Sequence, residues 1–175
     1  MPVDTSRTFT PINIAVLTIS DTRTLDDDTS GALLAGRVTG AGHNLIERAI
    51  EKDVVDRIVS RLNDWIDDRR VDCVITTGGT GLTGRDVTPE ALERVREKDI
   101  PGFGELFRWL SFKTIGTSTV QSRAMAVLSR GTYIFALPGS NGAVKDGWDQ
   151  ILAEQLDSRN RPCNFVELMP RLREV

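Results

Sequence analysis

The chain has 175 residues, and its 22 Lys and Arg against 25 Asp and Glu give a net charge of −3. A chain of this length can form a core that buries roughly 70% of the unfolded surface, so it needs neither disulfides nor metals for stability. We therefore expect a single domain over residues 1–175. The slight acidity, with no basic run longer than a pair, argues against a nucleic-acid partner.

Cysteine spacing and hydropathy indicate the compartment in which we expect the protein. Cys73 and Cys163 stand far apart in the sequence and have no metal-binding or redox spacing, which favours a reduced, intracellular protein. The polar start of the chain lacks the apolar region of a signal peptide, and no stretch approaches the roughly 18 apolar residues of a membrane span. We expect a cytoplasmic protein with no membrane partner.

The first part of the chain predicts two strand–helix steps. Residues 12–19 form a short apolar, largely β-branched run, which is typical of a buried strand. A small and acidic loop over residues 26–31 leads into a helix that glycines end near residue 40. Residues 44–50 predict a second strand, and Asp53 is the predicted N-cap of the helix after it.

A third step begins with a predicted strand over residues 73–76 and a glycine-rich turn over residues 77–81. Thr88 is the predicted cap of the next helix, with Pro89 in its first turn. The repeated alternation of strand and helix predicts an α/β fold with a mainly parallel sheet that is covered on both faces.

The second half of the chain continues this alternation. We expect helices over residues 101–112, 121–129 and 140–156. We expect strands over residues 133–137 and 164–168. Because ligands bind beyond the carboxyl ends of the strands in open sheets, the functional residues should lie in the loops that follow strands.

The glycine-rich segment over residues 79–84 matches the spacing of a dinucleotide-binding motif. In that motif the helix begins among the glycines, whereas here Pro89 delays it. A P-loop is also incomplete, because Arg85 and Asp86 stand where Lys and Ser or Thr are needed. Two interpretations stay open: a loop whose amides and hydroxyls bind an anion, or a tight turn without a ligand.

Two acids are candidates for a metal site. Asp53 and Asp86 both precede predicted helices that follow strands, so a parallel sheet would bring them to the same rim. Two carboxylates can hold Mg²⁺ beside phosphates, because this ion favours hard oxygen ligands and shares its remaining positions with water and substrate. The alternative for Asp53 is simple helix capping.

Hydroxyl and guanidinium donors form a second set of candidates. Ser122 and Arg123 begin a predicted helix and could receive a phosphate there, and Ser140 has the same two interpretations of ligand binding or capping. The segment 28–31 could likewise cap the first helix without touching a ligand. His43 has no acid or nucleophile near it in the sequence, and we expect a surface turn residue.

Aromatic residues at helical spacing, Phe103, Phe107, Trp109 and Phe112, indicate core packing or subunit contact.

Six motifs of the sequence resemble the molybdenum cofactor biosynthesis proteins of the MoaB and MogA type. They are Ser20-Asp21, Asp28-x-Ser30-Gly31, Thr77-Gly78-Gly79-Thr80-Gly81, Asp86-Val87-Thr88-Pro89-Glu90-Ala91, Pro101-Gly102-Phe103-Gly104-Glu105 and Leu137-Pro138-Gly139.

Further segments look like the MoaB branch of this family. They are Leu110-Ser111-Phe112, Ile115-Gly116-Thr117-Ser118-Thr119, Gln121-Ser122-Arg123-Ala124 and Arg161-Pro162-Cys163-Asn164-Phe165. The resemblance implies a three-layer α/β/α sandwich, a molybdopterin-binding pocket and a homotrimer or homohexamer. It also implies that a phosphate of molybdopterin attacks the α-phosphate of Mg-ATP and releases pyrophosphate.

The resemblance assigns roles to individual residues. It implies that Asp86 and Asp53 are catalytic and hold Mg²⁺ and the nucleotide. It implies that the ligand-binding residues are Ser20, Asp28, Ser30, Gly31, Thr77, Gly78, Gly79, Thr80, Gly81, Ser122, Arg123, Pro138, Gly139 and Ser140. The sequence does not decide between ATP and GTP.

Two other functions compete with this interpretation. A nucleotide- or pterin-binding oligomer of the same pathway would bind its ligands without turnover. A nicotinamide-dependent oxidoreductase is the more remote alternative, because it would need the helix to begin within the glycine-rich segment. The intact Asp86-Val87-Thr88-Pro89-Glu90-Ala91 motif favours an active molybdopterin adenylyltransferase.

Overall fold

A computed structural model describes residues 3–174 of the chain. Six strands form one sheet in the order β2-β1-β3-β6-β5-β4, in which β2, β1, β3 and β6 are parallel and β5 and β4 are antiparallel to their neighbours. The strands are β1 Asn13–Ile19, β2 Asn44–Glu51, β3 Cys73–Thr77, β4 Lys98–Asp99, β5 Met125–Ser129 and β6 Thr132–Leu137.

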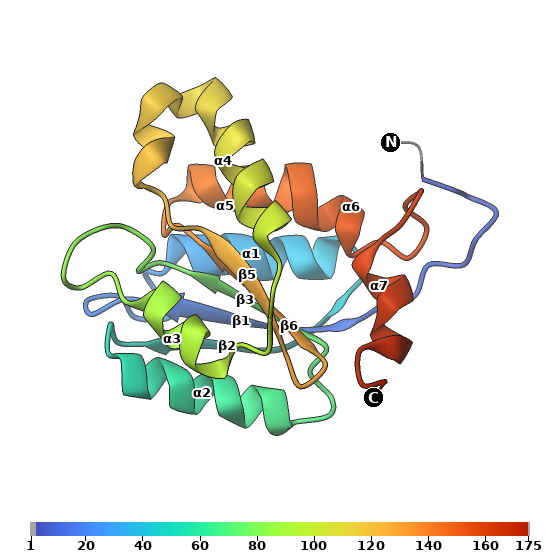
Figure 1. The fold of residues 1–175 in the computed structure, drawn as a ribbon, viewed down its shortest axis with the longest axis horizontal. Helices are drawn as coiled ribbons and strands as arrows, with labels where there is room; N and C mark the ends of the chain where they lie inside the picture. The colour runs from blue at the N-terminus through green and yellow to red at the C-terminus, as the bar shows by residue number, and fades with distance from the viewer. Residues whose placement is uncertain (1–2, 175) are drawn as a thin grey trace.

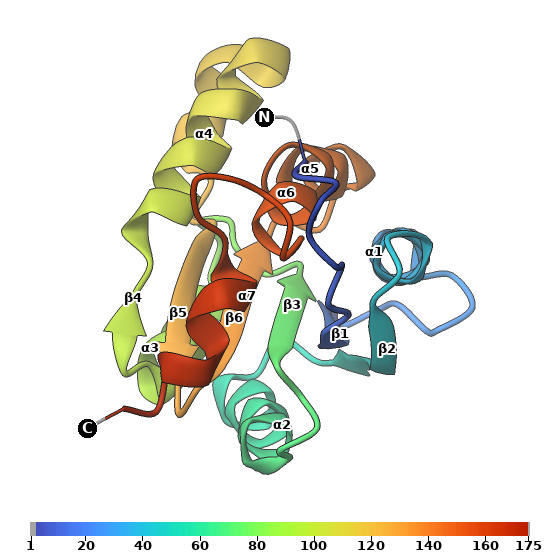
Figure 2. The ribbon, with the colours of Figure 1, turned by 90° about the vertical axis from the view of Figure 1, so that its right-hand side faces the viewer.

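Helices cover both faces of this sheet (Figures 1 and 2). One layer holds α1 Thr29–Gly40, α4 Pro101–Ile115, α5 Asn141–Gly147 and α6 Ala153–Gln155, and the opposite layer holds α2 Val55–Asp67 and α3 Thr88–Val95. A π-helical turn, Trp148–Leu152, joins α5 to α6, and α7 Phe165–Leu168 lies near the C-terminus. The predicted three-layer α/β/α sandwich with a mainly parallel sheet is confirmed.

Two separate hydrophobic clusters fill the space between the layers. Alternate residues of a strand serve the two clusters: Ile75 packs with α1, α4 and α5, while Val74 packs with α2 and α3. Burial on both faces explains why β1 and β3 are almost entirely apolar in sequence. In the part of the chain that the structure describes, no helix is long and apolar enough to cross a membrane.

The carboxyl ends of three central strands coincide. Thr18 of β1 pairs with Thr77 of β3, which pairs with Leu137 of β6. The chain leaves β1 toward α1 on one face and β3 toward α3 on the other, so the topological switch point at which open sheets bind ligands lies between these strands. The three loops after β1, β3 and β6 therefore converge at one edge of the sheet.

Residues 121–129 were expected to be helical, and this prediction was wrong. A 3₁₀ segment, Gly116–Gln121, ends before them, and β5 then forms a hairpin with β6. Arg130 and Gly131 make the two-residue turn, both with positive φ, 47° and 87°. The strand is buried on both faces and therefore lacks the alternation of polar and apolar residues that identifies a strand.

The predicted strand over residues 164–168 was also wrong. These residues form α7, a single helical turn whose N-cap Asn164 accepts a hydrogen bond from the Glu167 N–H at 2.9 Å. Asn followed three residues later by Glu is the sequence pattern of a helix start, and it outweighed the β propensity of Phe165 and Val166.

Three further predictions about single residues were wrong. Val54 is the N-cap of α2, so Asp53 lies one residue outside the helix and does not cap it. Thr88 is the first residue of α3, and its hydroxyl donates to the Gly78 carbonyl. His43 is buried, because its ring packs against Phe9 and Trp148 and its Nδ1 accepts from a backbone N–H.

Candidate functional site

The glycine-rich loop after β3 joins the three strand ends tightly. The Gly78 N–H donates to the Leu137 carbonyl at 2.9 Å, and a Cβ on Gly78 would lie 2.3 Å from the Ile19 carbonyl oxygen. Its φ of +107° is also strained for any other residue. Glycine is therefore required where the loops after β1, β3 and β6 meet.

Gly79 has a similar requirement and touches one of the predicted catalytic acids. Its φ is +64°, and a Cβ there would lie 2.4 Å from the Thr88 hydroxyl oxygen and 3.0 Å from Asp53 Oδ1. The Gly79 carbonyl also accepts from the Thr88 N–H at 3.0 Å. The loop thus holds the start of α3 and lies close to Asp53.

Replacing Gly79 by Ala should lower the free energy of unfolding by about 2 kcal/mol, through left-handed backbone strain and overpacking against Thr88. Gly84→Ala is the matched control, because a Cβ at Gly84 meets no atom within 4 Å, and its effect should stay within about 0.5 kcal/mol. Urea unfolding at equilibrium measures both. Equal effects in the two variants would contradict the strain argument.

Asp53 and Asp86 both lie close to the loop segment 79–81. A Cβ on Gly81 would be 2.8 Å from Asp86 Oδ2, just as one on Gly79 would approach Asp53. Hydrogen bonds from the Thr83 hydroxyl and N–H, at 2.7 and 2.8 Å, hold the pKa of Asp86 below its usual value. The two predicted carboxylates therefore do meet at the same rim.

Asp53 has the opposite electrostatic character. Burial, together with the negative charges of Asp21 and Asp86, raises the pKa of Asp53, and Arg85 opposes this effect. A carboxylate that is destabilised by neighbouring acids gains from a bound cation. Among residues 3–174, however, no three Asp, Glu, His or Cys side chains are grouped closely enough to hold a metal by themselves.

Arg123 orders the same loop in the structure. Its guanidinium donates to the carbonyls of Gly81 and Asp86, at 2.7 and 2.6 Å, and forms an ion pair with Glu90. Its backbone N–H donates to the Thr80 carbonyl at 3.0 Å. The segment that carries Asp86 is thereby fixed to the strand β5 side of the molecule.

A cavity of about 420 Å³ opens on one side of this loop. Predicted residues in its lining are Thr80, Gly81, Ser122, Pro138 and Ser140. Its walls also include residues that the sequence did not single out as ligand-binding: Phe107, Ser111, Thr114, Ile115, Ser118, Thr119, Gln121, Gly142, Ala143, Lys145 and Asp146. An apolar wall with a few hydroxyls, the Lys145 ammonium group and the Asp146 carboxylate suits a flat heterocycle with polar substituents.

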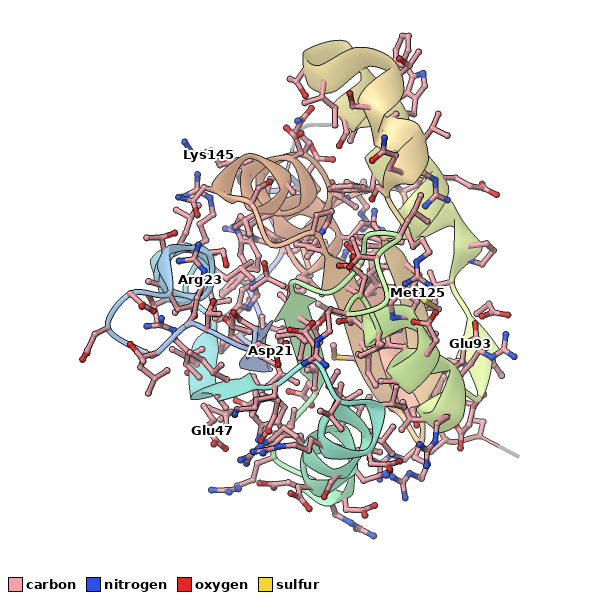
Figure 3. The ribbon with its side chains drawn as sticks, turned by 90° about the vertical axis from the view of Figure 1, so that its left-hand side faces the viewer. Asp21, Arg23, Glu47, Glu93, Met125 and Lys145 are labelled. Atoms are coloured by element: carbon pink, nitrogen blue, oxygen red, sulfur yellow. The ribbon has the colours of Figure 1, made fainter. Side chains whose placement is uncertain are left out.

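A second cavity, of about 470 Å³, lies between the loop after β1 and the end of β2. It is rich in charge, and its lining includes Ser20, Asp21, Arg23, Lys52 and Arg57. Figure 3 shows this edge, with Asp21 near its middle, Arg23 toward α1 and Lys145 on α5. Gly81, which lies beside Asp86, lines the apolar cavity, and Lys52, which precedes Asp53, lines the charged one.

Three predicted ligand-binding residues lie inside the protein instead. Asp28 is the N-cap of α1, and its carboxylate accepts from the Gly31 N–H at 2.9 Å and from the Thr18 hydroxyl at 2.6 Å. Ser30 donates to the same carboxylate, and Arg48 pairs with it at 2.9 Å. Asp28, Ser30 and Gly31 are therefore occupied in fixing the start of α1.

Thr77 and Gly139 bring the loops after β3 and β6 close together at the carboxyl edge of the sheet. The Thr77 hydroxyl donates to the Pro138 carbonyl at 3.1 Å, and a Cβ on Gly139 would lie 3.2 Å from the Gly78 Cα. Ser140 caps α5, because its Oγ accepts from the Ala143 N–H at 3.1 Å, and it also lines the first cavity. Capping and ligand contact are thus compatible at Ser140.

Comparison with known proteins identifies the family of the chain. The family described as "Probable molybdopterin binding domain" matches residues 15–158. Molybdenum cofactor biosynthesis protein B of Escherichia coli K12 is 48% identical over 160 residues, which are 91% of this chain and 94% of that protein. The protein of the same name from Bacillus subtilis is 39% identical and covers 83% of this chain and 86% of its own length.

Solved structures give the same result. A crystal structure of molybdenum cofactor biosynthesis protein B superposes with a TM-score of 0.86 at 35% identity, over 95% of this chain and 98% of that one. The tungsten cofactor synthesizing protein MoaB from Pyrococcus furiosus superposes with a TM-score of 0.74 at 34% identity, over 82% and 92%. The chain belongs to the molybdopterin-binding domain family, in the group of the molybdenum cofactor biosynthesis proteins B.

Proposed function

We propose that the protein acts in molybdenum cofactor biosynthesis and transfers the adenylyl group of ATP to molybdopterin. The observation that carries the proposal is that each acid lies next to a residue that lines a cavity: Asp86 lies beside Gly81 of the apolar cavity, and Asp53 follows Lys52 of the charged one. The apolar cavity suits the pterin, and the charged cavity suits the phosphates of a nucleotide. Family membership and the names of the relatives support the pathway.

In the proposed reaction, an oxygen of the terminal phosphate of molybdopterin attacks the α-phosphorus of ATP. A new P–O bond forms, the bond from the α-phosphorus to the bridging oxygen of the β-phosphate breaks, and pyrophosphate leaves with that electron pair. Such a transfer depends mainly on alignment and on neutralising charge, so no nucleophile of the protein is needed. The loop amides near Thr80 and Gly81 would orient the attacking phosphate at the rim of the first cavity.

Mg²⁺ fits the acids on chemical grounds. Asp86 is held ionised by Thr83, and Asp53 lies in a cluster of negative charge that a cation would relieve. Mg²⁺ typically uses one or two carboxylates and completes its shell with water and phosphate, so these two suffice. When bound, it supplies neutralisation of the phosphate charge.

Mass spectrometry of molybdopterin incubated with the protein, Mg²⁺ and ATP tests the proposal. The expected product is adenylylated molybdopterin, with one pyrophosphate released for each molecule formed. Association of both ligands without pyrophosphate release would establish a binding protein without turnover and contradict the proposal. A parallel reaction with GTP determines the nucleotide preference.

We also propose that the protein is a homo-oligomer that associates through the outer face of α4. Five large apolar side chains are exposed there and on the segment that follows: Leu106, Trp109, Phe112, Ile115 and Val120. Phe103 and Phe107 of the same helix point into the core, so the helix is apolar on both sides. An apolar patch of this kind is typical of a subunit contact.

Replacing Trp109 and Phe112 together by Glu should convert the oligomer to monomers, because both side chains are more than half exposed in the single chain. The control is Leu168→Glu, at another exposed apolar residue, on α7. Light scattering coupled to gel filtration gives the mass of each. A monomeric starting protein, or an unchanged mass in the double variant, would contradict this assembly.

A further inference from the structure

An ion pair links two of the loops at the carboxyl edge. The Arg85 guanidinium donates through Nε to Asp21 Oδ2 at 2.8 Å and forms a second bond through Nη2. Asp21 follows β1, and Arg85 lies between β3 and α3. The Arg85 side chain is still 64% exposed, so it has room to move.

This ion pair lies beside Asp53 and Asp86, which form an acidic cluster with Asp21. The charges of Asp21 and Asp86 both act unfavourably on ionised Asp53, and Arg85 is the cation that opposes them. Exposed ion pairs contribute little to stability, because water and salt screen them. The position of Arg85 is therefore better explained by charge balance at the site than by stabilisation of the fold.

Asp21 also lines the charged cavity, together with Arg23, Lys52 and Arg57. Arg57 pairs with Glu51, whereas neither Arg23 nor Lys52 forms an ion pair with another side chain of residues 3–174. The cavity thus has four cationic side chains against the two acids Asp21 and Glu47, and Asp21 is also the partner of Arg85. One guanidinium group can donate two parallel hydrogen bonds to a phosphate group, as it does to a carboxylate.

We propose that Arg85 binds the phosphates of the nucleotide and that Asp21 competes with those phosphates for its guanidinium. The identity of the nucleotide rests on the proposed function. Binding exchanges one anion for another on the same side chain: Arg85 leaves the carboxylate and pairs with phosphate. Arg85 is then a nucleotide-binding residue, and Asp21 sets how readily it is released.

The two partners of the ion pair should have opposite effects on binding. Arg85→Ala should weaken the binding of Mg-ATP and of inorganic pyrophosphate roughly tenfold, and Asp21→Asn should tighten both about threefold. In the Arg85→Ala background the effect of Asp21→Asn should disappear, since it acts through Arg85. Isothermal titration calorimetry in Mg²⁺ measures all four proteins, with thermal unfolding to verify their fold.

Arg37 and Asp149 provide the matched control. They form a bidentate surface pair between α1 and the turn after α5, with both bonds at 2.7 Å. Arg37→Ala and Asp149→Asn should leave the affinity for both probes unchanged.

Three results would overturn the proposal: unchanged affinity in Arg85→Ala, weaker binding in Asp21→Asn, or an Asp21→Asn effect that persists without Arg85. Pyrophosphate release is measured separately on the wild-type protein. Binding through Arg85 without turnover would contradict only the proposed function, and turnover with unchanged affinity in Arg85→Ala would contradict only this inference. A wild-type protein that binds neither probe would contradict both.

Discussion

Replacing Asp86 by Asn should lower the rate of adenylylation at least about 100-fold, which is about 2.7 kcal/mol of barrier. The carboxylate lies beside Gly81, which lines the apolar cavity, and Asn removes its charge while keeping its shape. Because the side chain bonds mainly to the nearby Thr83, the fold should survive. Single-turnover measurement of product, beside thermal unfolding of the same sample, separates the two effects.

Asp67→Asn is the control for this variant. Asp67 is an exposed acid at the far end of α2, where it pairs with Arg130, and its replacement should not change turnover. Asp53→Asn should resemble Asp86→Asn, since both carboxylates are assigned to the same cation. Turnover of Asp86→Asn within a factor of about two of the wild-type rate would remove its catalytic assignment.

The position of the candidate site at the carboxyl edge of the sheet was predictable from the sequence because it follows from the fold class. In a parallel sheet, the loops after the strands share one edge, so the glycine-rich segment and Asp86 could be placed there before any coordinates were known. Asp53 reached the same rim although its predicted capping role was wrong. Asp53 lies there because it follows shortly after the end of β2. The predicted strand over residues 44–50 is one residue shorter than β2.

The outer wall of the apolar cavity could not be predicted in the same way. Phe107, Thr114 and Thr119 come from α4 and the 3₁₀ segment after it, and they meet Ser140 only because α4 packs against α5. No spacing rule connects residues on two helices whose contact depends on the tertiary fold. The hairpin of β5 and β6 was missed for a related reason: burial on both faces removes the alternation that distinguishes a strand from a helix.

Asp28 illustrates how a motif residue can serve the fold. Its sequence position allowed both ligand binding and capping, and in the structure its side chain is fully buried with four donors around it. Arg48 reaches the same carboxylate from β2, so the acid connects α1, β1 and β2. A charged group satisfied in this way is a structural element of the protein interior.

Asp28→Ala should therefore lower the free energy of unfolding at pH 7 by about 3 kcal/mol, the lower end of the range for breaking a buried pair, because Arg48 is partly exposed. Burial alone would raise the pKa of Asp28, but hydrogen bonds from Thr18, Gly31 and Arg48 lower it overall. A lowered folded-state pKa means that the stabilisation is present above the unfolded pKa of about 3.9 and is lost as the pH falls through the folded value.

Urea unfolding from pH 7 down to about pH 3 measures the difference in free energy of unfolding between the wild-type protein and Asp28→Ala. This difference should be constant near neutrality and should shrink only below about pH 4. Asp26→Ala, at an exposed acid two residues earlier, should change stability by less than about 0.5 kcal/mol at every pH. Affinity for molybdopterin, measured well below the unfolding temperature, should be unchanged in Asp28→Ala. Burial and capping predict that Asp28→Ala is less stable but binds molybdopterin normally. An Asp28→Ala variant that keeps wild-type stability and loses molybdopterin binding would instead assign Asp28 to the ligand.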